Sequence, residues 1–163
     1  MSEQVFESVA SPTPAQTPSG LSLKKALIGF IAGFIAVLVF HQAVLALLAS
    51  IGVVAAKVYV TAPTAPFGIP QVLSLAFWGG VWGVVFAWVQ SRFPRGAGYW
   101  IAALVFGAIF PSLVAWFIAA PLKGLPIAAG GDVHRIITGL LVNGAWGVGT
   151  ALIYRFATRG TSR

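Results

Sequence analysis

Four apolar segments, each long enough to cross a lipid bilayer, dominate the sequence. They run over residues 26–52, 71–90, 99–120 and 136–154. A membrane-spanning helix needs about 20 apolar residues, and a helix satisfies all of its own backbone hydrogen bonds in lipid. The pattern predicts an all-α membrane protein, a four-transmembrane-helix bundle, with its transmembrane domain over residues 23–157.

Proline and glycine separate the four segments. The connecting stretches read APTAPFGIP (62–70), FPRGAG (93–98) and PLKGLPIAAGGD (121–132). Proline lacks a backbone donor and glycine resists helix, so these stretches are predicted loops. The first apolar run continues past Gly52 to Ala56, which leaves two alternatives open: a tilted span or an outer helical extension.

Composition indicates which solvent faces the chain. Only 8% of the residues are charged, against about 25% in a soluble domain, so lipid must cover most of the surface. The absence of cysteine excludes disulfides and thiolate metal sites.

The two ends of the chain are predicted to be tails. Residues 1–22 lack the pattern of a signal peptide and are predicted to form a disordered cytoplasmic tail, or alternatively a docking tail for a partner. Residues 158–163 predict a basic cytoplasmic tail.

The basic residues favour one side of the predicted membrane. Seven fall on the side that holds both termini: Lys24, Lys25, Arg92, Arg95, Arg155, Arg159 and Arg163. Three fall on the other side: Lys57, Lys123 and Arg135. Cytoplasmic loops carry an excess of Lys and Arg, so both termini are predicted to be cytoplasmic. The net charge of +7 is therefore read as a topology signal, and no nucleic-acid partner is predicted.

A short motif recurs in the second and fourth apolar segments. GGVWGV at 79–84 resembles NGAWGV at 143–148, and GIP at 68–70 precedes one as GLP at 124–126 precedes the other. The echo predicts two repeated helical hairpins of the same topology. Independent use of the same packing residues is the alternative.

Small residues spaced four apart mark one face of three predicted helices. They are Gly29, Gly33, Gly79, Gly83, Gly139, Asn143 and Gly147. Small faces let helix backbones approach closely in lipid. These residues therefore predict helix packing, either within one bundle or at the interface of a homo-oligomer or a larger membrane complex.

Two polar residues interrupt the first apolar segment near its middle. His41 and Gln42 lie there, and Asn143 of the fourth segment lies at a comparable depth. His41 is predicted to face the bundle interior and to bond Asn143, a tryptophan indole, a hydroxyl or a carbonyl freed by Pro111. Either this bond is structural, or His41 and Asn143 bind a small apolar molecule such as haem, quinone or lipid. Since one chain offers a single deep histidine, bis-histidine haem would need a dimer.

The outer edge of the fourth segment carries a small polar cluster. Asp132 directly precedes the apolar run and is predicted to cap the helix N-terminus. A metal or anion site with His134 is the alternative, but two ligands without a third are a weak metal signal, so no metal is predicted. The sequence contains no catalytic motif, and the protein is predicted not to be an enzyme.

Three stretches carry a resemblance to other proteins. GFIAGFIAVLVFHQ (29–42), PFGIPQVLSLAFWGG (66–80) and the pair PLKGLPIAAG and LLVNGAWGVGTAL (121–130 and 140–152) resemble a family of four-span integral membrane proteins of proteobacteria. The resemblance covers about residues 24–156. It implies a bacterial inner membrane and transfers no catalytic or ligand-binding residue.

Three functions follow as expectations. A non-enzymatic accessory or interaction subunit, with no cofactor, comes first. A binder or carrier of haem, quinone or lipid centred on His41 is the alternative, and a transporter of a neutral solute is the second alternative.

Overall fold

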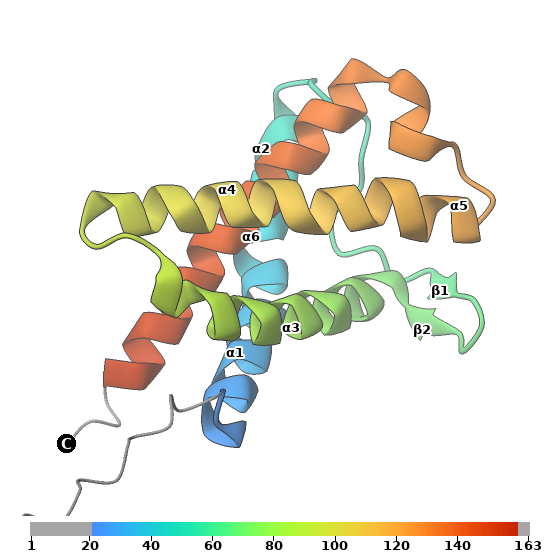
Figure 1. Ribbon diagram of the computed structural model, residues 1–163. Coiled ribbons are helices and arrows are strands. Elements are labelled where there is room, and N and C mark those ends of the chain that lie inside the picture. The colour runs from blue at the N-terminus through green and yellow to red at the C-terminus, as the bar shows by residue number, and fades with distance from the viewer. Residues whose placement is uncertain (1–20, 160–163) are drawn as a thin grey trace, which may run out of the picture.

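Four helical spans make up the computed structural model, which describes residues 21–159 (Figure 1). The first span joins α1 (Leu23–Ala36), η1 (Val37–His41) and α2 (Gln42–Ser50), and the second joins α3 (Gln71–Val89) and η2 (Gln90–Arg92). The third joins α4 (Ala97–Val114), η3 (Ala115–Ala119) and α5 (Ala120–Leu122), and the fourth is α6 (Val133–Arg159). Each span is long and apolar enough to cross a membrane. The all-α four-helix bundle is confirmed.

The ends of the first span follow from local chemistry. Ser22 caps α1, and its hydroxyl accepts from the Lys25 backbone N–H at 3.3 Å. At the other end Gly52 has a φ of +75°, a left-handed conformation that glycine adopts without strain. The helix therefore stops near Ser50, and the apolar residues up to Ala56 form neither a longer span nor a helical extension.

The third and fourth spans are longer than the sequence predicts. The third runs to Leu122 and includes Pro121, which the sequence pattern places in the following loop. A proline ring clashes with the carbonyl four residues earlier in a regular helix, but the wider π-helical turn of η3 makes room for it. The fourth span runs over Val133–Arg159, so Thr158 and Arg159 continue the helix. Residues 1–20 and 160–163 of the two predicted tails lie outside the described residues.

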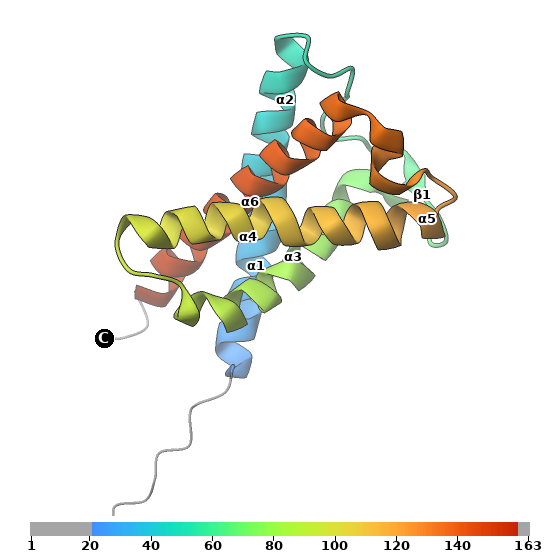
Figure 2. The same ribbon diagram turned by 45° about the horizontal axis from the view of Figure 1, so that its top comes forward.

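The spans pack as two hairpins. α1 packs mainly on α3, α4 packs mainly on α6, and the hairpins meet where α1 contacts α6. Figures 1 and 2 show α1 beside α3 and α4 beside α6 from two directions. The glycines explain both pairings, because backbone lies against backbone at Gly29 and Gly83 in one hairpin and at Gly107 and Gly147 in the other. The pairing matches the predicted two-hairpin organisation.

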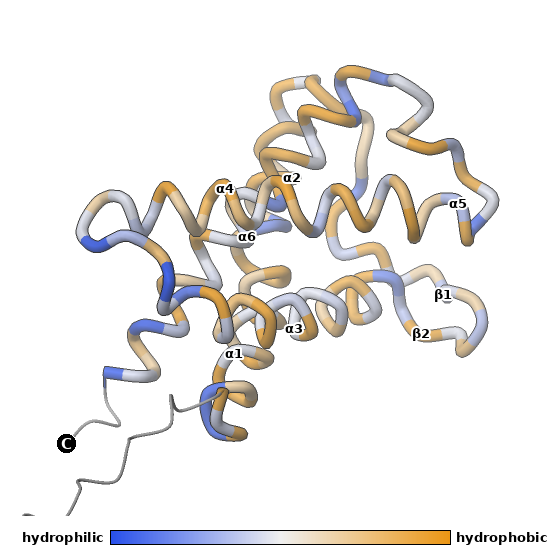
Figure 3. The backbone as a smooth tube through the Cα atoms, viewed as in Figure 1, coloured by the Kyte–Doolittle hydropathy of each residue, from blue (hydrophilic) through white to orange (hydrophobic). Residues whose placement is uncertain are grey.

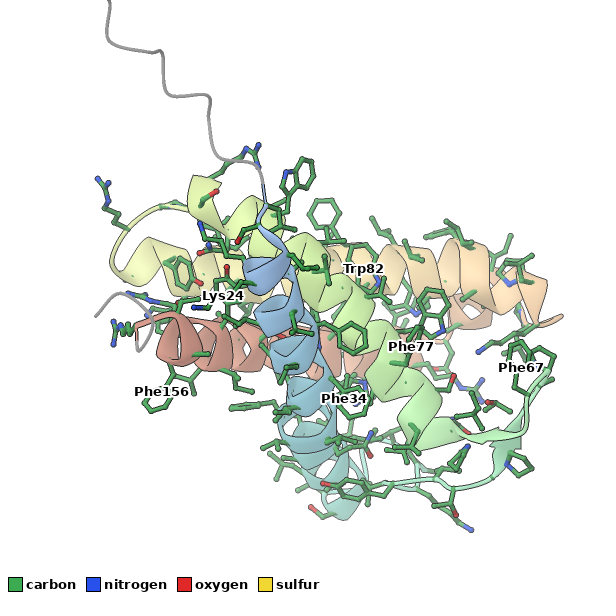
Figure 4. All side chains as sticks on the ribbon, turned by 90° about the horizontal axis from the view of Figure 1, so that it is seen from below. Lys24, Phe34, Phe67, Phe77, Trp82 and Phe156 are labelled. Carbon is green, nitrogen blue, oxygen red and sulfur yellow. The ribbon has the colours of Figure 1, made fainter. Side chains whose placement is uncertain are left out.

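The connections at one end of the bundle are the more structured ones. β1 (Pro63–Thr64) pairs antiparallel with β2 (Ile69–Pro70) in a short hairpin whose tip carries the exposed Phe67. Figure 4 shows Phe67 at the opposite end of the molecule from Lys24 and Phe156. The other connection contains η4 (Ile127–Gly131), whose backbone turns left-handed from Ala128 to Gly130.

Hydropathy is distributed as a membrane bundle requires. Apolar colour runs along all four spans in Figure 3, and hydrophilic residues gather where α1 begins, where α3 turns into α4 and where α6 ends. The described basic residues of those three places are Lys24, Lys25, Arg92, Arg95, Arg155 and Arg159. This end is hereafter the basic end of the bundle, and the end with β1, β2 and η4 is the loop end.

Candidate functional site

A cavity of about 560 Å³ opens between the two hairpins. The second and third spans line it with their halves nearest the loop end, and the first and fourth spans form its back wall. Its lining consists of Val37, His41, Leu75, Trp78, Gly79, Trp82, Pro111, Val114, Ala115, Trp116, Ile118, Ala119, Leu122, Lys123, Gly139, Val142, Asn143 and Trp146. A cavity of this size lies within the usual range for small-molecule sites, about 300–1,000 Å³.

The helix pairing creates this cavity. α3 packs mainly on α1 and α4 mainly on α6, and the consecutive helices α3 and α4 contact each other through aromatic side chains. There Trp82 and Phe106 form an edge-to-face pair at 6.1 Å, and Phe86 and Phe93 continue the aromatic contact toward the basic end. Figure 4 places Trp82 between the two helices. Of these rings, Trp82 lines the cavity, and the phenylalanines pack beyond it.

The mouth of the cavity lies between α3 and the η3–α5 segment. Trp78, Ile118 and Leu122 line the cavity and are also exposed on the outer surface. Lys123, which directly follows α5, supplies a cation beside the opening. In a bilayer this mouth faces lipid, with Lys123 at the level where the span ends.

Both π-helical segments of the described chain form walls of this cavity. η1 contributes Val37 and His41, while η3 contributes Ala115, Trp116 and further residues. π-helical turns are rare and occur frequently at functional sites, because the widened turn redirects side chains. Two such turns on one cavity are therefore a structural pointer to a binding site.

His41 lies at the deep wall of the cavity within a defined hydrogen-bond network. Its side chain is 8% exposed, and its Nδ1 lies 3.4 Å from the amide Nε2 of Gln42. The Gln42 Oε1 accepts from the backbone N–H of Tyr59 at 2.9 Å. The Tyr59 hydroxyl donates to the Leu38 carbonyl in η1 at 2.7 Å. Tyr59 has a φ of +49°, and a non-glycine residue held this way is strained, a condition that is common at functional sites.

Asn143 lies in the same cavity but does not bond His41. Its amide Nδ2 contacts the Ser112 hydroxyl at 2.9 Å, across the α4–α6 interface. The partners predicted for His41 are therefore wrong. The His41 side chain bonds Gln42, the next residue along the chain, through Nδ1. The two predicted binding residues do share one cavity and a similar depth, each about 14–15 Å of helix from the loop end at roughly 1.5 Å per residue.

Trp146 connects the two hairpins at the back of the cavity. Its side chain is 2% exposed, and its indole N–H donates to the Gly33 carbonyl at 2.9 Å. Trp82, which holds the matching position in the repeated motif, contacts Phe106 of the other hairpin. Each tryptophan of the repeat thus reaches across to the first helix of the opposite hairpin, which gives the sequence echo a shared structural role.

The predicted small-residue faces lie at helix contacts inside the chain. A Cβ added to Gly29 would stand 2.5 Å from the Gly83 carbonyl oxygen, and one added to Gly33 would overlap the Gly79 carbonyl. Gly147 lies against Ala103 and Gly107 of α4. Gly139 instead faces the indole of Trp116 on the cavity wall, where an added Cβ would stand 3.0 Å from the ring.

The outer polar cluster acts as a helix cap. The Asp132 Oδ1 accepts from the backbone N–H of His134 at 3.0 Å and of Arg135 at 3.2 Å, as the N-cap prediction requires. Arg135 also pairs with Oδ2 at 3.3 Å. Among residues 21–159, no group of three His, Cys, Asp or Glu side chains could hold a metal ion.

Sequence reasoning missed three residues that shape the site. Tyr59 orients Gln42 from a loop, and no sequence signal marks it. Ser112 holds Asn143, and Gly107 lets α4 approach α6. Gly107 could have been found, because it is a small residue four positions after Ala103 in the third span. Ser112 could have been found as a polar residue within that apolar span.

Comparison with known proteins gives no match from which a function could be inferred. No protein-family model, no curated protein and no solved structure matches this chain.

Proposed function

We propose that this protein binds a small lipophilic molecule in the cavity between its two hairpins. The observation that carries the proposal is the cavity itself: about 560 Å³, lined by apolar and aromatic side chains, with the His41 ring on its deep wall. An apolar pocket with a few convergent polar groups is the usual form of a small-molecule site. Its mouth lies between helices that face lipid, so a molecule dissolved in the bilayer enters without crossing water.

The expected role as an accessory subunit receives less support. It rested on small-residue faces that dock other helices, and those faces are occupied within the chain. Gly29 and Gly33 meet Gly79 and Gly83, and Gly147 meets Gly107. A partner protein or a second copy would have to use a different surface.

Transport of a neutral solute and catalysis are also less supported. Aromatic rings pack between the cavity and the basic end: those of Trp82, Phe86, Phe93 and Phe106. Within the described part of the chain, the cavity therefore opens at its mouth and has no second opening toward the basic end. Its lining contains no serine, cysteine or carboxylate, and its two titratable side chains lie apart, His41 on the deep wall and Lys123 beside the opening, so the lining does not bring a nucleophile and a base together. Binding or carriage of a lipophilic molecule requires only the cavity and its mouth, and neither a second opening nor a catalytic group.

We propose a bacterial inner membrane as the location, with the basic end in the cytoplasm. The support is the excess of Lys and Arg at that end, together with the resemblance to four-span proteins of proteobacteria. In this orientation the mouth of the cavity opens to the outer leaflet, and Lys123 lies at the outer headgroup level.

Filling the cavity tests the proposed function. Ala119 lines the cavity on η3, and Ala119→Phe places a ring in the space that the ligand would occupy. The chain is purified in mild detergent from the membranes in which it is made, and an organic extract is analysed by mass spectrometry. We expect a lipophilic molecule to be retained by the wild type and lost from Ala119→Phe.

A matched control separates cavity filling from a general effect of a new ring. Ala46 is exposed on α2 and lies outside the cavity, so Ala46→Phe should retain the molecule as the wild type does. Identical extracts from the wild type and Ala119→Phe, with both proteins folded, would refute the proposal.

A further inference from the structure

We infer that the ligand of this cavity is a lipid-soluble quinone whose carbonyl oxygen accepts a hydrogen bond from the Nε2–H of His41. The inference rests on the proposed function and adds the chemical class of the ligand. It follows from the polarity of the network around His41, which determines the ring nitrogen that carries the proton.

Tyr59 fixes the orientation of the Gln42 amide. The backbone N–H of Tyr59 can only donate, and it lies 2.9 Å from one end of that amide. This end must therefore be the carbonyl oxygen Oε1, which leaves the NH₂ group on the side of His41. The Tyr59 hydroxyl, bonded to the Leu38 carbonyl, holds the loop residue against the first span.

The orientation of Gln42 then fixes the tautomer of His41. An amide NH₂ group donates and does not accept, so Nδ1, 3.4 Å away, must be the unprotonated, accepting nitrogen. A buried ring with no anion beside it is neutral. Asp132 is the single acidic residue of the described chain. It lies at the loop end, where its carboxylate caps the first turn of α6. The proton of His41 therefore lies on Nε2.

This polarity is the opposite of what a haem or metal ligand needs. A ligating histidine presents an unprotonated nitrogen to the metal and donates its other N–H to an acceptor. His41 receives a hydrogen bond at Nδ1 and offers a proton at Nε2. Among the described residues, the one hydrogen bond that the His41 ring makes is at Nδ1, which leaves Nε2 without a protein acceptor. The acceptor is thus supplied by the ligand.

The other lining residues suit a ligand that is planar, uncharged and able to accept a hydrogen bond. Its lining has the indoles of Trp78, Trp82 and Trp116, which favour a planar ring. The charged group among its lining residues is Lys123, and there is no carboxylate, so an amine or other cation would find no ion-pair partner and would meet a like charge. A quinone ring fits between the indoles with one carbonyl at His41, while its alkyl or isoprenoid tail leaves through the mouth beside Trp78 and Ile118.

The test uses the full chain in lipid nanodiscs and a decyl-substituted benzoquinone as the probe. The chain contains two histidines, so ¹⁵N-histidine labelling gives two sets of ring signals, and His134→Phe assigns them. We expect His41 to be neutral, with the proton on Nε2, and the Nε2 signal to shift when the quinone is added. This measurement needs no variant at position 41 and holds whether or not such a variant folds.

Affinity provides the second readout. His41→Phe keeps an aromatic ring and removes the donor, and it should weaken retention of the quinone by about 3- to 10-fold, the effect of one lost hydrogen bond. His134→Phe changes an exposed histidine outside the cavity and should bind as the wild type does. A proton on Nδ1, or equal affinity in His41→Phe and the wild type, would overturn the inference.

Two further outcomes identify a different ligand class. Phospholipid esters also offer carbonyl acceptors and are already present in the nanodisc, so a His41 signal that the quinone leaves unchanged would overturn the quinone assignment. Binding of ferric haem with a His41-dependent Soret band would overturn the donor role. In both cases, loss of a native lipophile in Ala119→Phe would leave the proposed function standing, whereas its absence from the wild type would refute that function separately.

Discussion

Replacing Gly83 or Gly147 with alanine is expected to destabilise the bundle by about 3 kcal/mol, the upper end of the cost of overpacking a filled contact. A Cβ at Gly83 would overlap the Gly29 carbonyl oxygen and stand 3.0 Å from the Gly33 Cα. One at Gly147 would overlap the Ala103 carbonyl and stand 2.9 Å from the Gly107 Cα. These neighbours are backbone atoms, so relief requires the two helices to separate.

Gly144 provides the control on the same helix as Gly147. A Cβ there would meet Ala108 Cβ at 3.6 Å, an ordinary contact. Since alanine favours helix over glycine by up to about 1 kcal/mol, Gly144→Ala should be neutral or stabilising. The free energy of unfolding is measured by titrating the folded protein with a denaturing detergent. If Gly83→Ala and Gly147→Ala matched Gly144→Ala, close backbone contact would not hold the hairpins together.

Truncation of Trp146 should have an effect of similar size. The indole is 2% exposed and donates to the Gly33 carbonyl across the hairpin boundary. Trp146→Ala removes the packing and the hydrogen bond, and we expect a loss of about 3 kcal/mol, the low end for a buried tryptophan, because lipid supplies no hydrophobic drive. Trp146→Phe keeps most of the packing and should cost about 1 kcal/mol for the bond.

Trp88 shows what a tryptophan outside the bundle core contributes. It is 54% exposed, and its ring contacts the Arg92 guanidinium at 5.0 Å. Trp88→Ala should cost less than about 1 kcal/mol. The same detergent titration compares the three variants. Equal losses in Trp146→Ala and Trp88→Ala would mean that the contact between α6 and α1 does not bind the hairpins to each other.

The spans and their packing faces could be predicted because each depends on local sequence. Runs of apolar residues bounded by proline and glycine define the four helices, and residues spaced four apart define Gly29, Gly33, Gly79 and Gly83 as one contact. Asp132 could be recognised as a cap because capping involves only the next three residues. No long-range information is needed for any of these.

The site needs information that the sequence pattern does not contain. A helix that is apolar on every face has no periodicity to fix its rotation, so the pairing of Asn143 with Ser112 rather than His41 could not be anticipated. The two π-helical turns rotate every residue after them around the helix axis, and no proline or glycine within η1 or η3 marks them in the sequence. Tyr59 reaches Gln42 through the path of a loop. The cavity results from these features together.

The position of a bound quinone is the most direct test of this account. The full chain would be crystallised from a lipid phase with a benzoquinone that carries bromine on its ring, and the bromine located by anomalous scattering. We expect the signal inside the cavity, among Trp78, Trp82 and Trp116 and next to His41. Bromine found only on the outer lipid-facing surface, around residues such as Phe117, with the cavity filled by its own side chains, would contradict the account.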